Sequence, residues 1–329
     1  VLTCMLFGAI SGSGQATFAA VGSIMIPLMV QEGYDKKFVT GLTASSGGLG
    51  VLIPPSIPMV MYAITTDISV GKMLTSGILP GILCGTCLMI YAYLYCKKNP
   101  PSNSMERKEG MSIMESLKNG FWALLTPVII LGGIYSGMFT ATEAAAVSVV
   151  YGLLVSLLIY RTIKIKDLPK ILLTAAKLNA PILIIVAAAT VLGKVLTIQR
   201  IPELIATTIL SITNNKYLIL IFLNILLLIV GMLMETLAAI TILAPILLPI
   251  ATGIGIDPIH FGVIMVANLA IGFVTPPVGT NLYTAVALTG LSVKDVSKAI
   301  IGPVIALLVA QLFIIIIPAL STFLPSFIK

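Results

Sequence analysis

The sequence predicts an all-α polytopic membrane protein that contains inverted structural repeats, with two re-entrant helical hairpins and two broken transmembrane helices. One observation behind this prediction is composition: of 329 residues, 58% are hydrophobic and only 9% are charged, against about a quarter in a soluble domain. Another is that apolar runs near the roughly 20 residues needed to span a bilayer recur from end to end. A further one is an internal repeat of two interrupted segments. Together they exclude a soluble globular fold.

The first two apolar stretches are interrupted by residues that break a helix. Residues 2–30 are interrupted at Ser11–Thr17, which leaves two halves that are each too short to cross a membrane. This predicts a re-entrant hairpin, whose tip is tolerable at membrane depth only where it is buried in protein or lines a polar cavity. Residues 38–64 are interrupted at Gly50–Pro58, where prolines end the incoming helix and leave backbone carbonyls without partners.

The middle of the chain is simpler. Uninterrupted spans are expected over residues 77–95, 121–136, 143–160 and 172–197. The polar, basic residues 96–118 form a loop with a short amphipathic run before the second of these spans. Thr140 and Glu143 have the spacing of a capping box, which favours a helix-capping role for Glu143 over a place in an ion pathway.

The last third repeats the interrupted pattern of the first. Residues 217–250 are interrupted at Met234–Thr236, residues 261–288 are interrupted at Gly272–Asn281, and a final span follows at 300–324. An offset of 222 residues brings together several glycine, aspartate and proline positions, namely Gly33 with Gly255, Asp35 with Asp257, Gly50 with Gly272, and Pro54–Pro55 with Pro276–Pro277. Because these helix-breaking and helix-capping residues recur at one constant offset, they indicate an internal duplication.

The surplus of positive charge, +7 at neutral pH, is distributed unevenly between the two predicted faces. If each broken helix crosses once and each hairpin returns to its own side, five crossings separate the hairpins, so the second enters from the opposite face. Fourteen Lys and Arg residues then fall on one face and five on the other. Because basic residues favour the cytoplasmic side, the first hairpin is expected to open from the cytoplasm and the second from outside. No nucleic-acid partner is needed to explain the charge.

The interruptions predict binding sites, since they bring hydroxyl groups, glycines and freed carbonyls together at membrane depth. C-terminal helix ends favour a cation and N-terminal ends favour an anion, so we expect Na⁺ at each tip and an anionic substrate between them. Candidates for the first Na⁺ site are Ser11, Gly12, Ser13, Gly14, Gly50, Pro54 and Ser56, and for the second Glu235, Thr236, Gly272, Thr275, Val278 and Gly279. Candidates for substrate contact are Ser13, Thr17, Ser56, Thr236, Thr280 and Asn281.

Glu235 is the one acid of the twelve that lies well inside an apolar segment. A carboxylate in that position is costly and is therefore a functional hypothesis by default. The alternative is that a partly hydrated carboxylate holds the hairpin to a neighbouring helix.

Nine motifs, in order along the chain, resemble the large membrane subunit of tripartite ATP-independent periplasmic (TRAP) transporters. They are Gly8–Gly14, Gly22–Pro27, Gly33–Asp35, Ile53–Met59, Gly77–Gly81, Phe139–Ala144, Gly231–Thr236, Gly255–Gly262 and Val274–Asn281. The resemblance implies a Na⁺-driven importer of organic anions, such as C4-dicarboxylates or sialic acid, in the bacterial cytoplasmic (inner) membrane. It also implies a small membrane subunit and an extracytoplasmic solute-binding protein as partners, no enzymatic activity, and no cofactor besides Na⁺ as the coupling ion.

The resemblance further implies an elevator-type mechanism with three regions of chain. Residues 1–95 would form the first transport half, residues 96–216 the basic loop with connecting and scaffold helices, and residues 217–329 the second transport half. Many family members have an acidic residue where Thr17 stands, so a polar contact is expected to differ there. The chain begins inside an apolar run at Val1, and we expect it to be truncated at its N-terminus relative to the family.

Other classes of function fit the sequence less well. A Na⁺-coupled anion symporter of the same architecture without a binding protein stays open, as does a channel, although two symmetric breaks favour alternating access. An antiporter would show paired buried acids, and an intramembrane enzyme would need paired titratable groups or a nucleophile with a base, whereas His260 is the only histidine. A phosphate-cradling Gly-Lys motif of the kind expected in an ATP-driven pump is missing.

Overall fold

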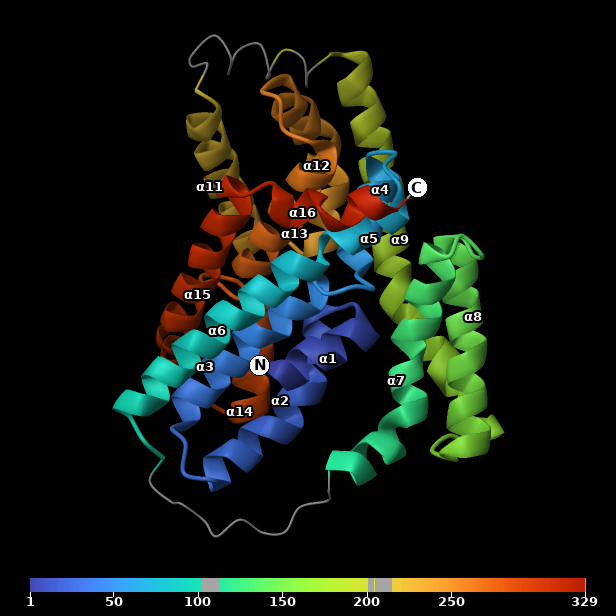
Figure 1. Cartoon of the computed structure of the whole chain (residues 1–329), viewed down its shortest axis with the longest axis vertical. Helices are drawn as coiled ribbons and strands as arrows, with labels where there is room; N and C mark the ends of the chain where they lie inside the picture. The colour runs from blue at the N-terminus through green and yellow to red at the C-terminus, as the bar shows by residue number, and fades with distance from the viewer. Residues whose placement is uncertain (102–112, 201–203, 205–214, 329) are drawn as a thin grey trace. The chain divides into compact units, whose positions relative to one another are not determined.

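The computed structural model describes residues 1–101, 113–200, 204 and 215–328 (Figure 1). Every regular element in these ranges is helical. Six helical segments in the described part are long and apolar enough to cross a membrane: Gly14–Gln31, Val70–Lys98, Ala141–Ile159, Lys216–Leu233, Thr236–Gly253 and Val293–Ile316. The predicted all-α polytopic membrane protein is confirmed at this level.

The chain divides into two compact units, of which the smaller comprises Met105–Ala188. Its described helices are α7 (Ile113–Tyr135), α8 (Ala141–Leu154), the π-helical turn η2 (Val155–Ile159), the 3₁₀ turn η3 (Ile165–Asp167) and the first part of α9 (Leu168–Ile198). Helices α7 and α8 pack together, and Tyr151 donates a 2.7 Å hydrogen bond to the carbonyl of Trp122. Thr140 and Glu143 form a capping box at the start of α8, as predicted. Arg107 and Lys108 of the predicted basic loop lie outside the described residues.

The larger unit, Val1–Ser104 with Ala189–Lys329, begins with two helices that meet at a sharp turn. Helix α1 (Leu2–Ser11) ends at Gly12, whose φ of 62° is the left-handed conformation that glycine adopts most easily. Helix α2 (Gly14–Gln31) starts directly afterwards, with the Ser13 side chain accepting a hydrogen bond from the Ala16 amide. The two helices pack against each other, so the predicted interruption is a tight hairpin turn.

The next predicted interruption is also present. Helix α3 (Lys36–Gly47), capped by Asp35, continues into the 3₁₀ turn η1 (Gly48–Val51). The chain then passes through Pro54–Pro55, which are joined by a cis peptide bond. Helix α4 (Ile57–Thr65) begins after the cap Ser56, whose hydroxyl accepts a hydrogen bond from the Met59 amide.

The second half of the larger unit has the same plan. Helices α11 (Lys216–Leu233) and α12 (Thr236–Gly253) meet at Met234 and Glu235, and Glu235 is the cap of α12. Helix α13 (Pro258–Gly272), capped by Asp257, is followed by the cis-linked Pro276–Pro277 and by helix α14 (Thr280–Thr289). The caps Asp35 and Asp257 are 222 residues apart, as are Ser13 and Glu235.

The remaining helices differ from the predicted bounds at their starts. A short helix, α5 (Val70–Ser76), precedes α6 (Ile78–Lys98). Helix α15 (Val293–Ile316) begins seven residues before the predicted start at residue 300, because Ser292 caps it and the helix continues beyond its apolar part. It ends earlier than predicted, and α16 (Ala319–Thr322) and η4 (Leu324–Phe327) complete the chain after Pro318. Apolar composition marks what lies in lipid, whereas a cap marks where a helix starts.

The two halves of the larger unit are interleaved rather than side by side. Helix α2 packs on α14, and α12 packs on α4, so the second arm of each helix pair contacts the broken helix of the other half. In Figure 1 the blue segment α2 accordingly lies beside the orange-red segment α14. Each first arm crosses its own broken segment at paired glycines, Gly8 with Gly50 and Gly231 with Gly272.

A buried amide cluster links three helices of the second half. The Asn268 side chain on α13 donates hydrogen bonds to the side-chain and backbone oxygens of Asn224 on α11, at 2.6 and 3.0 Å. The side chain of Gln311 on α15 donates to the same Asn224 oxygen at 2.9 Å. Leu88, at the position of the first half that an offset of 223 pairs with Gln311, is a fully buried apolar residue. The first half has no amide there.

Replacing Gly272 with alanine is expected to destabilise the fold, because the added Cβ would lie 2.7 Å from the Cα of Gly231. Overpacking of this kind costs about 1–3 kcal/mol. The control is Gly253→Ala, where an added Cβ meets no atom within 4 Å and alanine favours the helix. Thermal unfolding of the purified protein in detergent should show a lowered midpoint for Gly272→Ala alone. Equal midpoints for the two variants would contradict the close backbone crossing.

Candidate functional site

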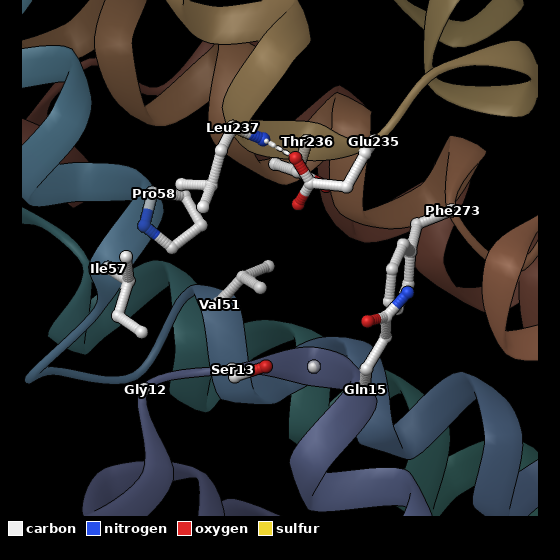
Figure 2. Close-up of a pocket in the computed structure, with 11 residues that line it drawn as sticks. Gly12, Ser13, Gln15, Val51, Ile57, Pro58, Glu235, Thr236, Leu237 and Phe273 are labelled. Carbon is white, nitrogen blue, oxygen red and sulfur yellow. Dashed lines mark hydrogen bonds between the residues drawn. The ribbon is translucent and has the colours of Figure 1, made fainter. Parts of the chain in front are cut away.

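A small hollow with a volume of about 40 Å³ lies where the turns of both helix pairs meet in the larger unit. Figure 2 shows Glu235, Thr236 and Leu237 on one side of it, facing Ser13 and Gln15 across the open space. The lining comprises Gly12, Ser13, Gly14, Gln15, Val51, Ile57, Pro58, Glu235, Thr236, Leu237 and Phe273. Segments more than 200 residues apart in sequence therefore build one site.

Most of this lining is related by the sequence offset. Adding 222 to the numbers of Ser13, Gly14, Gln15 and Val51 gives Glu235, Thr236, Leu237 and Phe273, and all eight residues line the hollow. Each half thus contributes the start of a helix after its turn and one side chain from its broken segment. The hollow is built from residues at matching sequence positions of the two halves, but the paired residues differ in chemistry.

Three helix N-termini border the hollow: those of α2, α12 and α4, whose first residues Gly14, Thr236 and Ile57 are all in the lining. The first turn of a helix has unpaired amide groups and a partial positive charge. The starts of helices are for that reason ready-made sites for anions. The lining includes no lysine or arginine, so the helix starts are its main source of positive potential.

The carboxylate of Glu235 lies at one of these helix starts, where it caps α12. One carboxylate oxygen, Oε2, accepts hydrogen bonds from the amides of Leu237 at 2.9 Å and Ala238 at 3.2 Å. The residue is exposed rather than buried, and its carboxylate borders the hollow. The equivalent position in the first half, Ser13, caps α2 through a neutral hydroxyl with a longer contact of 3.4 Å.

Hydroxyl groups gather behind the first turn. The hydroxyls of Ser11 and Thr17 are 2.7 Å apart, and Thr17 donates to the carbonyl of Ser13 at 2.7 Å. Thr17 is fully buried. Gly50 of the broken segment lies directly against this group, since a Cβ at Gly50 would contact the Thr17 hydroxyl and the Ser13 carbonyl. The structure thus brings Ser11, Ser13, Thr17 and Gly50 together.

The second turn approaches its broken segment through the backbone. The amide of Gly279 donates a 3.1 Å hydrogen bond to the carbonyl of Met232 at the end of α11. Gly279 has a φ of 32°, which explains why glycine stands there. The Thr275 hydroxyl is engaged with the carbonyl of Ile271 at 2.6 Å within α13 and its extension.

The predicted site residues are thus divided between the lining and the structure around it. Five of them line the hollow, namely Gly12, Ser13, Gly14, Glu235 and Thr236. The others are not in the lining: Ser11, Thr17, Gly50, Pro54, Ser56, Gly272, Thr275, Val278, Gly279, Thr280 and Asn281. Ser56 is buried and donates to the Val51 carbonyl, and Asn281 is buried and donates to the Ala44 carbonyl at 3.1 Å.

Sequence reasoning missed six lining residues, Gln15, Val51, Ile57, Pro58, Leu237 and Phe273. Four of them form the offset pairs Gln15 with Leu237 and Val51 with Phe273, so the repeat itself contained the signal that would have found them. The Ser45 hydroxyl and the side-chain oxygen of Asn281 are both buried, without a hydrogen-bond partner among the described residues.

The fold and the hollow define a class of protein: a polytopic helical membrane protein in which interrupted helices from two halves meet at a small internal site. Comparison with known proteins makes the class specific. The family model described as "Tripartite ATP-independent periplasmic transporter, DctM component" matches residues 1–320. The chain belongs to this family.

Several named relatives are similar over nearly the whole chain. The C4-dicarboxylate TRAP transporter large permease protein DctM of Pseudomonas aeruginosa is 46% identical over 330 residues, which cover 100% of this chain and 77% of the relative. The isethionate TRAP transporter permease protein DctMQ of Oleidesulfovibrio alaskensis is 45% identical over 98% of this chain. The sialic acid TRAP transporter large permease protein SiaM of Vibrio cholerae is 35% identical over 99% of this chain and 76% of the relative.

The chain spans about half the length of the isethionate relative, 51%, and about three quarters of the other two. The family assignment confirms the prediction of a TRAP large membrane subunit, and a transporter component rather than an enzyme.

Replacing Glu235 with alanine is expected to loosen the start of α12, because two amides lose their shared acceptor. Loss of an N-cap costs about 0.5–2 kcal/mol. Glu235→Ser is the matched control, since it supplies a neutral capping oxygen like that of Ser13. Hydrogen exchange measured by mass spectrometry should show faster exchange at Leu237 and Ala238 in the alanine variant than in the serine variant. Unchanged exchange in both would show that the cap is unimportant.

Proposed function

We propose that this chain is part of the large membrane subunit of a Na⁺-coupled secondary importer of organic anions in the bacterial cytoplasmic (inner) membrane. The observation that carries the proposal is the hollow shared by the two helix turns and lined by four offset-related pairs of residues. A small TRAP membrane subunit and an extracytoplasmic solute-binding protein are its proposed partners. The family assignment supports this, because the matched model describes one component of a tripartite transporter.

The proposed architecture is an inverted repeat, with α1–α2 and α11–α12 as re-entrant hairpins and α3–α4 and α13–α14 as broken helices. The crosswise packing of α2 on α14 and of α12 on α4 supports it, because a twofold relation between the halves exchanges these two contacts. The unequal distribution of basic residues supports a first hairpin that opens from the cytoplasm and a second that opens from outside. The halves would move together as the transport domain of an elevator.

The hollow is the proposed position of the substrate's anionic group. The helix starts of α2, α4 and α12 supply positive potential, and Ser13, Gln15 and Thr236 supply polar contacts in the lining. Apolar side chains, among them Val51 and Phe273, enclose the rest. The relatives are named for C4-dicarboxylate, isethionate and sialic acid transport; for this chain we propose an organic anion of that general class.

The proposed Na⁺ ions lie behind each turn, where oxygen ligands are available. For the first site, the support is the group formed by Ser11, Ser13, Thr17 and Gly50. For the second, it is the carboxylate oxygen of Glu235 that takes no part in the cap, in a residue that lines the same hollow as Phe273 of the broken segment. Oxygen-rich clusters next to interrupted helices are the usual sites of coupling ions in such transporters.

Uptake into proteoliposomes is the direct test. The protein, reconstituted with its small subunit and supplied with a cognate binding protein, should accumulate a radiolabelled organic anion only when a Na⁺ gradient is imposed. Replacing Na⁺ with K⁺ should abolish accumulation. Accumulation without a binding protein would instead favour a symporter of the same architecture that works alone, and Na⁺-independent flux would reject the coupling.

The role of the Glu235 charge can be separated from its role as a cap. Both Glu235→Ala and Glu235→Ser remove the charge, but only the serine variant retains a capping oxygen. We expect both variants to lose Na⁺-dependent uptake while remaining folded in the membrane. Recovery of uptake in Glu235→Ser would assign the residue to capping alone, and unchanged Na⁺ dependence in both would remove Glu235 from the coupling site.

A further inference from the structure

One end of the larger unit concentrates positive charge. Six lysines lie at the starts of α3 and α15 and at the end of α6, and we call this set the basic end: Lys36, Lys37, Lys97, Lys98, Lys294 and Lys298. Two contacts hold these helix ends together. Lys37 forms a 2.7 Å ion pair with Asp295 of α15, and the ring of Phe38 stacks on Tyr95 of α6 with centroids 3.9 Å apart.

Most of this charge is uncompensated. Within the described ranges, Lys37 is the one lysine of the basic end in an ion pair, and the other five are exposed. Of the nearby acids, Asp35 accepts a hydrogen bond from the Phe38 amide, Asp295 accepts from Lys37 and Ser292, and Glu32 at the end of α2 is exposed. Six lysines against these three acids leave this end with a net positive charge. This surplus leaves the lysines available for an external anion.

A hollow of about 490 Å³ opens at the same place. Residues at the end of α2 and the start of α3 form one side of it, and residues at the end of α6 form the other: Val30, Gly33, Tyr34, Asp35, Phe38, Tyr95, Asn99 and Pro100. Lys36 adjoins one side in sequence, and Lys97 and Lys98 adjoin the other. The aromatic rings of Tyr34, Phe38 and Tyr95 give it the amphipathic walls that suit the level of lipid headgroups.

Exposed apolar side chains continue from this hollow along the two helices that border it. Ile24 and Leu28 of α2 are exposed, as are Ile90 and Leu94 of α6. A bound molecule would therefore meet lysines and tyrosines at one end and aliphatic side chains along its length. Free anions match only the first of these features, whereas a phospholipid matches both.

We propose that the basic end binds an anionic phospholipid, with its headgroup in this hollow beside Lys36, Lys97 and Lys98 and its acyl chains along α2 and α6. Each lysine near an anionic headgroup adds to the attraction, and the ion pair of Lys37 with Asp295 fixes the helix ends that frame the site. The bound lipid stabilises the packing of α3, α6 and α15. The inference depends on the membrane-spanning fold and not on the transported substrate.

The test compares a triple variant, Lys36→Gln with Lys97→Gln and Lys98→Gln, against a control with the same change of net charge, Lys72→Gln with Arg200→Gln and Lys216→Gln. Phosphatidylglycerol titrated into the detergent-purified full chain and measured by native mass spectrometry should bind the triple variant roughly tenfold or more weakly than the wild-type and control proteins. The rise in thermal midpoint that the lipid produces should be lost in the triple variant alone.

Three results would overturn the proposal. Equal phosphatidylglycerol binding by the triple variant and the control would show that these lysines are not the site. An equal thermal shift with phosphatidylcholine would show that the headgroup charge is irrelevant. An equal shift with inorganic phosphate would identify a site for free anions rather than for a lipid. A triple variant that unfolds at the wild-type midpoint without lipid, yet gains no stability from phosphatidylglycerol, would confirm it.

Discussion

The structure depends on one constraint: backbone groups released where a helix stops inside an apolar segment must find partners within the protein. Water is absent from the hydrocarbon core, so an unpaired amide or carbonyl there is expensive. At three of the four breaks a polar side chain caps the next helix: Ser13, Ser56 and Glu235 accept hydrogen bonds from amides of the following turn. At the fourth break the backbone of Gly279 bonds to the end of α11 instead. The breaks can exist because the other half of the chain covers them.

This mutual cover explains why the halves are interleaved. Neither helix pair could shelter its own turn, since each turn lies at the ends of its own two helices. Packing α2 on α14 and α12 on α4 places the turns against broken segments of both halves, and the glycine pairs Gly8 with Gly50 and Gly231 with Gly272 let the backbones approach closely enough. The hollow is the small volume left where these turns meet.

Much of the fold followed from sequence because helix breakers are conspicuous in apolar segments. The glycines, serines and prolines at Ser11–Thr17, Gly50–Pro58 and Gly272–Asn281 marked three breaks, and Glu235 marked the fourth. Helix starts were less predictable, as α15 shows. Its first turns are polar and precede the apolar run from which the helix was predicted. The site was predicted only in part, because composition identifies polar groups and not the apolar walls. Val51 and Phe273 look like ordinary core residues until the fold places both beside the turns.

The correspondence between the two halves is incomplete in charge and in hydrogen bonding. Ser13 is neutral and Glu235 is acidic, although they occupy equivalent positions, and the amide cluster of Asn224, Asn268 and Gln311 has Leu88 at one matching place. Buried hydrogen-bonded groups fix one register between helices, whereas apolar surfaces tolerate sliding.

The volume of the hollow also has a consequence for molecular size. At about 40 Å³ it is far smaller than the roughly 300–1,000 Å³ of ordinary ligand pockets, and its walls are helix starts that belong to different halves of the chain. Under the proposed function, the hollow as it stands has room for a small anionic group, and a whole organic anion requires α2 and α12 to separate. The size of a bound substrate would therefore set the distance between the two turns, and both halves of the chain contribute to that distance.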